Sequence, residues 1–280
     1  MSALERRPGP SRRVKVVEHT ATTEGDAPVS REDRVITEEP LEIRLTWPGS
    51  PAASTWVTMR TPGHDFELAA GWALHEGLTG ADGVVTAAYC TAESLSAEQE
   101  FNVVTLSLRA TPARLPSATH RHLSTGSSAC GVCGSDTIAA VLATPRVPRW
   151  EGPPPSADLV RSLPDALHPR QSLFTRTGGV HAAALADADG NLLVVREDVG
   201  RHNAVDKVTG ARMLAGSPTA EALLVTSGRA GFEVVQKAAA AGVGSLVAVG
   251  APTSLAVDLA VRSGLRLYGF TTAQRTVQYA

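Results

Sequence analysis

The fold of this chain is decided by residues 222–270, ALLVTSGRAGFEVVQKAAAAGVGSLVAVGAPTSLAVDLAVRSGLRLYGF. Three short aliphatic runs have the length and composition of buried strands: Ala222–Thr226, Ser245–Val249 and Leu265–Phe270. Apolar residues recur at helical spacing in the segments between them, Phe232–Ala241 and Leu255–Ser263. Strands that alternate with helices of this length predict a sheet of parallel neighbours covered by helices.

The same alternation begins upstream of this stretch. Val180–Leu185 and Leu192–Arg196 predict a hairpin that turns at Asp189-Gly190, and His202–Ala215 predicts a helix after it. Together with residues 222–270 they predict a three-layer α/β arrangement.

The first half of the chain is richer in strand patterns. Strands are predicted for Arg34–Trp47 with a break at Pro40, and for Ser54–Arg60, Val84–Tyr89 and Phe101–Leu108. A Thr-Pro-Gly turn introduces a helix over residues 65–77, with Asp65 as its expected N-cap. We therefore expect a smaller N-terminal β-rich portion beside the α/β part.

Breaks in composition predict four segments. Residues 1–30 are interpreted as a flexible arm with at most one short strand, Val14–Val17. Residues 31–144 form the β-rich part, which includes a cysteine loop at 126–135 and a helix over Thr137–Ala143. Residues 145–156 are a Pro-rich connector. Residues 157–280 form the α/β part, in which a short helix, Ala157–Leu167, is expected to be interrupted by Pro164.

Composition narrows the classes of function. The chain has 26 Lys+Arg against 28 Asp+Glu and only 4% aromatic residues, so nucleic acid is not expected as a main partner. No apolar run approaches the roughly 18 residues of a membrane helix, and we expect a cytoplasmic protein with no membrane association. Three cysteines are too few for a disulfide scaffold.

Two of these cysteines form a close pair, Cys130 and Cys133, in the glycine-rich sequence ACGVCG. Small neighbours allow another molecule to approach an exposed thiolate, as sulfur transfer or thiol redox chemistry requires. A structural zinc site completed by His120 and His122 fits the same spacing, and so do two unreactive cysteines. The isolated Cys90 is interpreted as a buried core thiol.

Polar residues follow three consecutive predicted strands, which is where open α/β sheets bind ligands. Arg201, His202, Asn203 and Lys207 follow the first, Ser227, Gly228 and Arg229 the second, and Pro252–Ser254 the third. Helix N-termini at such turns favour phosphates. Each residue alone could equally be a helix cap or a member of a surface ion pair. The G-x-G-x-x-G and P-loop motifs are absent, which disfavours standard dinucleotide and P-loop folds.

The motifs SSACGVCG, TGGVHAAAL, REDVGRHNAVDKV, SGRAGFEVVQKA and APTSLAVDLA occur in this order. With TPGHDFELAAGWALHEGL in the first half, the chain resembles the formate dehydrogenase accessory sulfurtransferase (FdhD) family over about residues 30–270. The resemblance implies a cytidine deaminase-like mixed sheet. Deaminase chemistry itself is excluded, because His75 and Glu76 are adjacent and Ala129 stands where the deaminase signature requires proline.

The resemblance also implies a function. Such a protein receives sulfur from a cysteine desulfurase as a persulfide on Cys130, assisted by Cys133. It then transfers the sulfur to the molybdenum cofactor, a bis-molybdopterin guanine dinucleotide, before insertion into formate dehydrogenase. The cofactor is bound as substrate, a homodimer is implied, and no catalytic metal belongs to the protein. The residues expected to contact the cofactor are Arg201, His202, Asn203, Lys207, Ser227, Gly228, Arg229, Phe270, Thr271, Thr272, Ala273, Gln274 and Arg275. The alternative is a cofactor-binding chaperone with a structural Cys-x-x-Cys.

Overall fold

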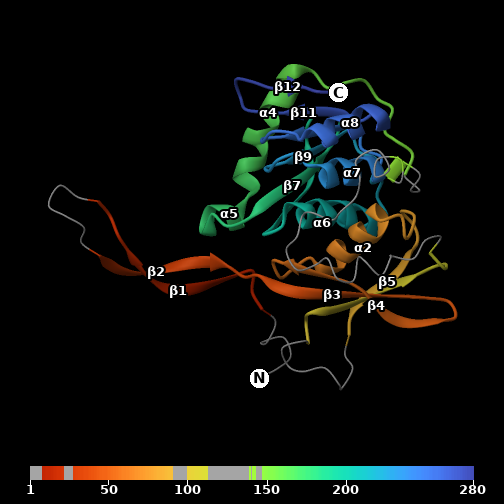
Figure 1. The fold of residues 1–280 in the computed structure, drawn as a ribbon, viewed down its shortest axis with the longest axis horizontal. Helices are drawn as coiled ribbons and strands as arrows, with labels where there is room; N and C mark the ends of the chain where they lie inside the picture. The colour runs from red at the N-terminus through yellow and green to blue at the C-terminus, as the bar shows by residue number, and fades with distance from the viewer. Residues whose placement is uncertain (1–7, 22–27, 91–99, 113–138, 140, 143–146) are drawn as a thin grey trace.

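The computed structural model describes residues 8–21, 28–90, 100–112, 139, 141–142 and 147–280. Two sheets dominate these residues, with helices packed between them and on the outer face of the larger sheet (Figure 1). A two-stranded hairpin projects from the body on the left of the same view. Among the described residues, no helix combines the length and the hydropathy that a membrane crossing requires.

The C-terminal part is built on a six-stranded mixed sheet with the strand order β12-β11-β10-β9-β7-β8. Its strands are β7 (His181–Ala186), β8 (Leu192–Asp198), β9 (Leu223–Thr226), β10 (Ser245–Ala248), β11 (Arg266–Gly269) and β12 (Val277–Gln278). β9, β10 and β11 are mutually parallel, whereas β7 runs antiparallel to both of its neighbours. The predicted α/β class and the hairpin around Asp189-Gly190 are therefore confirmed.

Helices cover both faces of this sheet. The elements are α4 (Ala157–Leu167), the 3₁₀ turn η2 (His168–Arg170), α5 (Ser172–Thr177), α6 (Arg201–Leu214), α7 (Phe232–Ala240) and α8 (Ser254–Ser263). On one face, α4 buries Val160, Leu163 and Leu167 against the sheet. α6, α7 and α8 pack on the opposite face, so this part has the three layers that the sequence predicts (Figure 1).

The N-terminal part contributes a four-stranded sheet and one buried helix. The sheet has the order β4-β3-β6-β5, from β3 (Glu39–Trp47), β4 (Ser50–Arg60), β5 (Val84–Tyr89) and β6 (Val103–Leu108). Leu41, Ile43 and Leu45 alternate along β3 and turn their side chains inward. They pack in the same apolar cluster as α2 (Asp65–His75), which lies between this sheet and α6.

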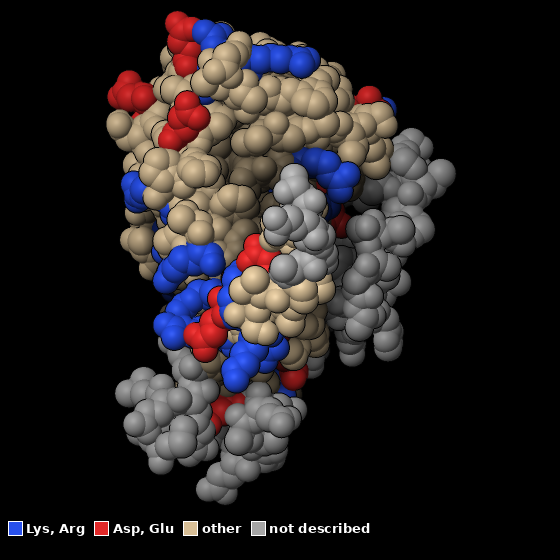
Figure 2. Space-filling model, turned by 90° about the vertical axis from the view of Figure 1, so that its left-hand side faces the viewer, with Lys and Arg blue, Asp and Glu red and all other residues tan. Residues whose placement is uncertain are grey.

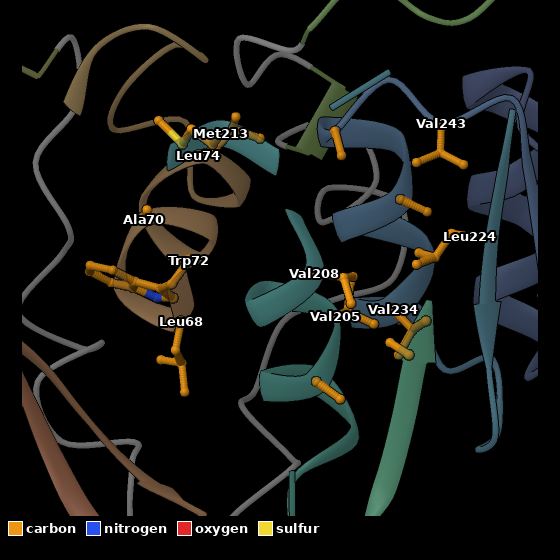
Figure 3. Packing of buried hydrophobic residues seen from close by; sticks show 14 of the residues in the cluster. Leu68, Ala70, Trp72, Leu74, Val205, Val208, Met213, Leu224, Val234 and Val243 are labelled. Atoms are coloured by element: carbon orange, nitrogen blue, oxygen red, sulfur yellow. The ribbon is translucent and has the colours of Figure 1, made fainter. Parts of the chain in front are cut away.

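Two glycines allow α2 and α6 to cross with their backbones in direct contact. A Cβ on Gly71 would lie 1.9 Å from the carbonyl oxygen of Asp206, and a Cβ on Gly210 would lie 1.8 Å from that of Glu67. Trp72 on α2 is directed away from α6 and stacks on Trp56 of β4, whereas Val205 on α6 lies beside Val234 of α7 (Figure 3). All but the partly buried Trp56 belong to one buried apolar cluster, against which Trp56 packs. The core of the N-terminal part is therefore continuous with that of the C-terminal part.

The N-terminal arm differs from the prediction. β1 (Ser11–Glu18) pairs with β2 (Val29–Ile36) over its whole length, so these residues form an antiparallel hairpin instead of a flexible arm with one short strand. β2 continues toward α5, which it contacts. Residues 1–7 and 22–27 are not among the residues that the structure describes.

Two helix details were also predicted wrongly. α4 continues through Pro164, because its buried apolar residues hold the helix on the sheet despite the backbone hydrogen bond that proline removes. His64, in the left-handed region with φ of 58°, stands at the N-cap of α2, because the Asp65 carboxylate accepts hydrogen bonds from Arg60 and Tyr89 instead. The helix predicted from Thr137 falls mostly outside the described residues.

Candidate functional site at the carboxyl edge of the larger sheet

Four loops meet at one edge of the six-stranded sheet. β8, β9, β10 and β11 all point the same way, because β8 and β9 are both antiparallel to β7. The loops at their carboxyl ends therefore gather at one edge, and β7 begins there with His181. Figure 2 views the molecule from this side and shows a hollow with Lys and Arg side chains at its margin.

The hollow contains a pocket of about 620 Å³. Pro164 and His168, at the end of α4 and in η2, line one side of it, and Phe174 and the Gly178-Gly179 pair, on and after α5, line another. His181, Ser227 and Val249, at the ends of β7, β9 and β10, line the rest. Ser227 was predicted from sequence, whereas His168 and Phe174 were missed. The glycine pair and His181 belong to the quoted motif TGGVHAAAL, which was the signal that could have located this wall.

Arg201 and Gly228 lie against each other at this edge. A Cβ on Gly228 would be 3.5 Å from His181 Nδ1 and 3.6 Å from Arg201 Cδ, so both side chains lie next to the Gly228 backbone. The Nε of Arg201 is buried and has no hydrogen-bond partner among the described residues. Burial lowers the pKa of His181, and the nearby Arg201 and Arg229 lower it further. The Arg201–Gly228 contact therefore combines positive charge with a guanidinium nitrogen that has no acceptor in the described part of the chain.

The loop after β9 is held mainly by backbone. Ser227 Oγ accepts a hydrogen bond from the Ala182 amide at 2.9 Å, and the Gly228 carbonyl accepts one from the Gly250 amide at 3.0 Å. These bonds tie the loop to β7 and to the loop after β10. Arg229 is exposed beside them.

The C-terminal segment Phe270–Arg275 forms a tight turn after β11. Phe270 has a φ of 50° and is 42% exposed, and the guanidinium of Arg275 lies 5.3 Å from the centre of its ring. The Thr272 amide donates to the Arg275 carbonyl at 2.7 Å, which closes the turn. Thr272, Ala273, Gln274 and Arg275 are exposed, whereas Thr271 is buried and its Oγ1 lies 3.0 Å from that of Thr276.

A buried ion pair supports the edge from behind. Lys207 Nζ lies 2.6 Å from Asp198 Oδ2 and donates to the Thr61 carbonyl at 2.9 Å. The other oxygen of Asp198 accepts from the Gly200 amide and from Asn203 Nδ2. Asn203 Nδ2 also donates to the Met59 carbonyl at 2.8 Å. The network joins β8 and α6 to the end of β4.

Lys207 and Asn203 therefore differ in position from the other predicted residues. Both were predicted to contact a cofactor, but their exposed fractions are 1% and 5%. Their polar atoms bond interior partners instead of pointing outward. We therefore replace the predicted contact with the cofactor by a supporting role, in which both residues hold the loop that carries Arg201. Lys207 also does not pair with its neighbour Asp206, which bonds Lys237 at 2.8 Å instead.

The predicted cysteine site lies outside the described residues. Cys130, Cys133, His120 and His122 all fall within 113–138, so the zinc and sulfur-transfer interpretations stay open. In the described part of the chain, no group of three or more His, Cys, Asp or Glu residues is arranged to hold a metal ion. Cys90 is only half-buried at the end of β5, and its Sγ accepts from Arg44 Nη1 at 3.8 Å. Its predicted core burial was wrong, because β5 ends there at the sheet's edge.

Comparison with known proteins identifies the family. A model of the FdhD/NarQ family matches residues 36–280, which is most of the chain. This chain belongs to the FdhD/NarQ family. It is 46% identical over 256 residues to the "Sulfur carrier protein FdhD" of Streptomyces avermitilis, a match that covers 90% of this chain and 88% of the relative. The corresponding protein of Mycobacterium tuberculosis is 43% identical over 251 residues, with 88% of this chain and 89% of the relative covered.

A solved structure shares the fold of this FdhD/NarQ family member. The crystal structure of a formate dehydrogenase accessory protein from Desulfotalea psychrophila superimposes with a TM-score of 0.69. The match covers 95% of this chain and 96% of that one, at 22% sequence identity. At this level of identity the similarity concerns the fold alone.

A second buried polar cluster lies between α2, α6 and α7. His75 Nδ1 lies 2.6 Å from Asp206 Oδ1, and Lys237 Nζ lies 2.8 Å from the same oxygen. Burial alone would raise the pKa of Asp206, but Lys237 and His75 outweigh it and lower that pKa. Burial lowers the pKa of His75. At the outer end of the same helix interface, His202 Nε2 lies 3.0 Å from Glu233.

We expect these histidines to make the folded protein acid-sensitive. Burial, followed by the charges of Lys237 and Arg201, lowers the pKa of His202 from 6.5 to about 3. Because the unfolded chain takes up that proton first, stability is full above pH 6.5 and falls as the pH drops toward 3. Between pH 7.5 and 5, His202 alone contributes a loss of up to about 2 kcal/mol. Urea unfolding at both pH values measures this loss. If the free energy of unfolding of His202→Gln falls between pH 7.5 and 5 by as much as that of wild type, the prediction is wrong.

Proposed function

We propose that this chain is a sulfur carrier for the molybdenum cofactor. It takes sulfur from a cysteine desulfurase as a persulfide on Cys130. It passes that sulfur to a bis-molybdopterin guanine dinucleotide before the cofactor enters formate dehydrogenase. The observation that carries the proposal is the Cys-x-x-Cys sequence in a chain with relatives that are 46% identical and bear the name sulfur carrier protein.

The sulfur chemistry needs only thiols and persulfides. The Cys130 thiolate attacks the terminal sulfur of the donor persulfide, a new S–S bond forms, and the donor cysteine leaves as its thiolate. Attack of the Cys133 thiolate on Cys130 Sγ would then release the carried atom as hydrosulfide and leave a Cys130–Cys133 disulfide. Cellular thiols return this disulfide to the reduced pair. Glycines beside both cysteines let donor and acceptor approach closely.

The carboxyl edge of the larger sheet fits a dinucleotide substrate. Its pyrophosphates require cationic donors, and Arg201 has a buried Nε without a partner among the described residues. Arg229 and Arg275 add exposed positive charge at loops of the same edge. α6, α7 and α8 also begin at this edge, and the backbone N–H groups at their N-termini favour anions.

Roles follow from these positions. Arg201, Arg229 and Arg275 would bind phosphates, and Gly228 would let them approach the backbone. The exposed residues of Phe270–Arg275 would cover the nucleotide, with the Phe270 ring available for stacking on a base. His202, Ser227 and Thr271 would form part of the protein surroundings of the bound nucleotide. The homodimer, the desulfurase and the formate dehydrogenase client remain predictions from the resemblance.

Intact-protein mass spectrometry tests the proposal. The protein is incubated with a cysteine desulfurase and cysteine, and wild type is compared with Cys130→Ala and Cys133→Ala. We expect a gain of roughly 32 Da that a reductant removes and that only Cys130→Ala abolishes.

Two other outcomes would replace the proposal. If wild type gains no mass and retains tightly bound zinc, the cysteines form a structural site with His120 and His122. If it gains no mass and holds no metal but still binds a guanine nucleotide, the chain is a cofactor-binding chaperone.

A further inference from the structure

Glu197 is not among the residues assigned to the substrate, yet it controls one wall of the pocket. It is the next-to-last residue of β8, and its carboxylate reaches across to the first turn of α5. Its Oε2 accepts the Leu173 amide at 2.8 Å, and its Oε1 accepts the Phe174 amide at 2.8 Å. One side chain from the sheet therefore satisfies two backbone donors of a helix that begins 25 residues earlier.

α5 depends on such an external cap. It has only six residues, which is too short for a helix to be stable by itself. None of its residues is buried, and its own N-cap residue, Gln171, makes no capping side-chain bond. A carboxylate that accepts two N–H groups at a helix N-terminus gives charge-assisted hydrogen bonds and favourable alignment with the helix dipole. Glu197 is thus the described group that fixes where this helix starts.

The position of α5 sets the shape of the pocket. Phe174 on α5 and the Gly178-Gly179 pair after it line the cavity opposite Pro164 and His168. The rings of Phe174 and His168 are 6.4 Å apart in an edge-to-face arrangement. On its other side α5 meets the projecting hairpin, where a Cβ on Gly179 would lie 3.2 Å from Ile36 Cγ2. With the hairpin behind it, the helix can shift mainly at its N-terminal end, where Glu197 holds it.

We propose that Glu197 is a positioning residue that holds the α5 wall in place for the guanine nucleotide half of the cofactor. The inference rests on the proposed function, because it assumes that this pocket receives that part of the substrate. Glu197 acts through the α5 backbone and needs no contact with the ligand. Without its carboxylate, the first turn of α5 loosens and Phe174 no longer has a fixed position.

The test uses the full-length protein and guanosine diphosphate, which contains the guanine, ribose and two phosphates of the nucleotide half. Calorimetry compares wild type with Glu197→Ala and Glu197→Gln. We expect Glu197→Ala to weaken binding about ten-fold, since two hydrogen bonds to a charged acceptor are lost. Glu197→Gln keeps one acceptor oxygen and should recover part of the affinity. Glu221→Gln is the matched control, because Glu221 pairs with Arg212 far from this edge.

Two further measurements, the melting temperature and persulfide loading, distinguish this positioning role from a purely structural one. If Glu197 positions the wall, the melting temperature stays within about 2 °C of wild type and persulfide loading on Cys130 falls less than two-fold. Equal losses of nucleotide binding and of loading, or unchanged affinity in Glu197→Ala, would overturn the inference. Absence of binding in the wild type would instead overturn the proposed nucleotide site itself.

Discussion

Replacement of Lys207 by methionine will lower the free energy of unfolding by about 3–5 kcal/mol. Methionine fills a similar volume but leaves the Asp198 carboxylate buried without its cation, since both side chains are at most 1% exposed. The remaining donors to Asp198 are the amides of Thr61 and Gly200 and the side chain of Asn203. They do not neutralise its charge. Urea unfolding at pH 7.5, followed by circular dichroism, measures the loss.

Two companion variants make this result specific. Arg13→Met removes the cation of an exposed pair with Glu32, and should cost at most about 1 kcal/mol. Adding Asp198→Asn to Lys207→Met removes the uncompensated charge, so the double variant should regain part of the stability. A loss below 1 kcal/mol in Lys207→Met would mean that the pair contributes little to joining β8 and α6 to the end of β4.

The second large effect is expected at the helix crossing. Gly71→Ala places a methyl group 1.9 Å from the Asp206 carbonyl oxygen, a distance that no side chain can occupy. α2 and α6 must separate, which opens the apolar core that the two helices share. We expect a loss of about 1–3 kcal/mol or more, although alanine itself favours helix over glycine by about 1 kcal/mol.

Gly231→Ala is the control for this variant. Gly231 has a φ of −81°, and nothing lies within 4 Å of the position of its Cβ. Gly231 is the N-cap of α7, where glycine is preferred to alanine, so the substitution should cost about 0.5–1 kcal/mol without any steric clash. If Gly71→Ala unfolds at the same urea concentration as Gly231→Ala, the close approach of the two helices is not required for the fold.

Local patterns predicted the C-terminal part well. The strands β9, β10 and β11 and the helices α7 and α8 begin and end within two residues of the predicted limits. Each is a short apolar run or a helical period with clear turn residues beside it, so nearest-neighbour preferences and tertiary packing agree. The hairpin β1–β2 was missed because its charged residues resemble a solvated arm when pairing between Val14 and Asp33 is unknown.

The gathering of Arg201, Gly228 and Arg275 at one edge could also be predicted, because parallel strands bring their carboxyl ends together. Burial of individual polar residues could not. Lys207 and Arg201 occupy the same helix and have similar sequence surroundings, but Lys207 faces Asp198 and Thr61 whereas Arg201 faces Gly228. Only the partner segments, distant in sequence, decide which cation is available to a ligand.

The sequence by itself determined the alternation of strands and helices, the location of the cysteine pair and the family to which the chain belongs. Each of these depends on residues that are close together along the chain. The tertiary structure alone decided that Gly71 and Gly210 meet, that Lys207 is a buried support, and that Glu197 caps α5. The helix crossing and the cap of α5 join segments that are 23 or more residues apart. The energies of all these contacts depend on burial and distance, which no local pattern records.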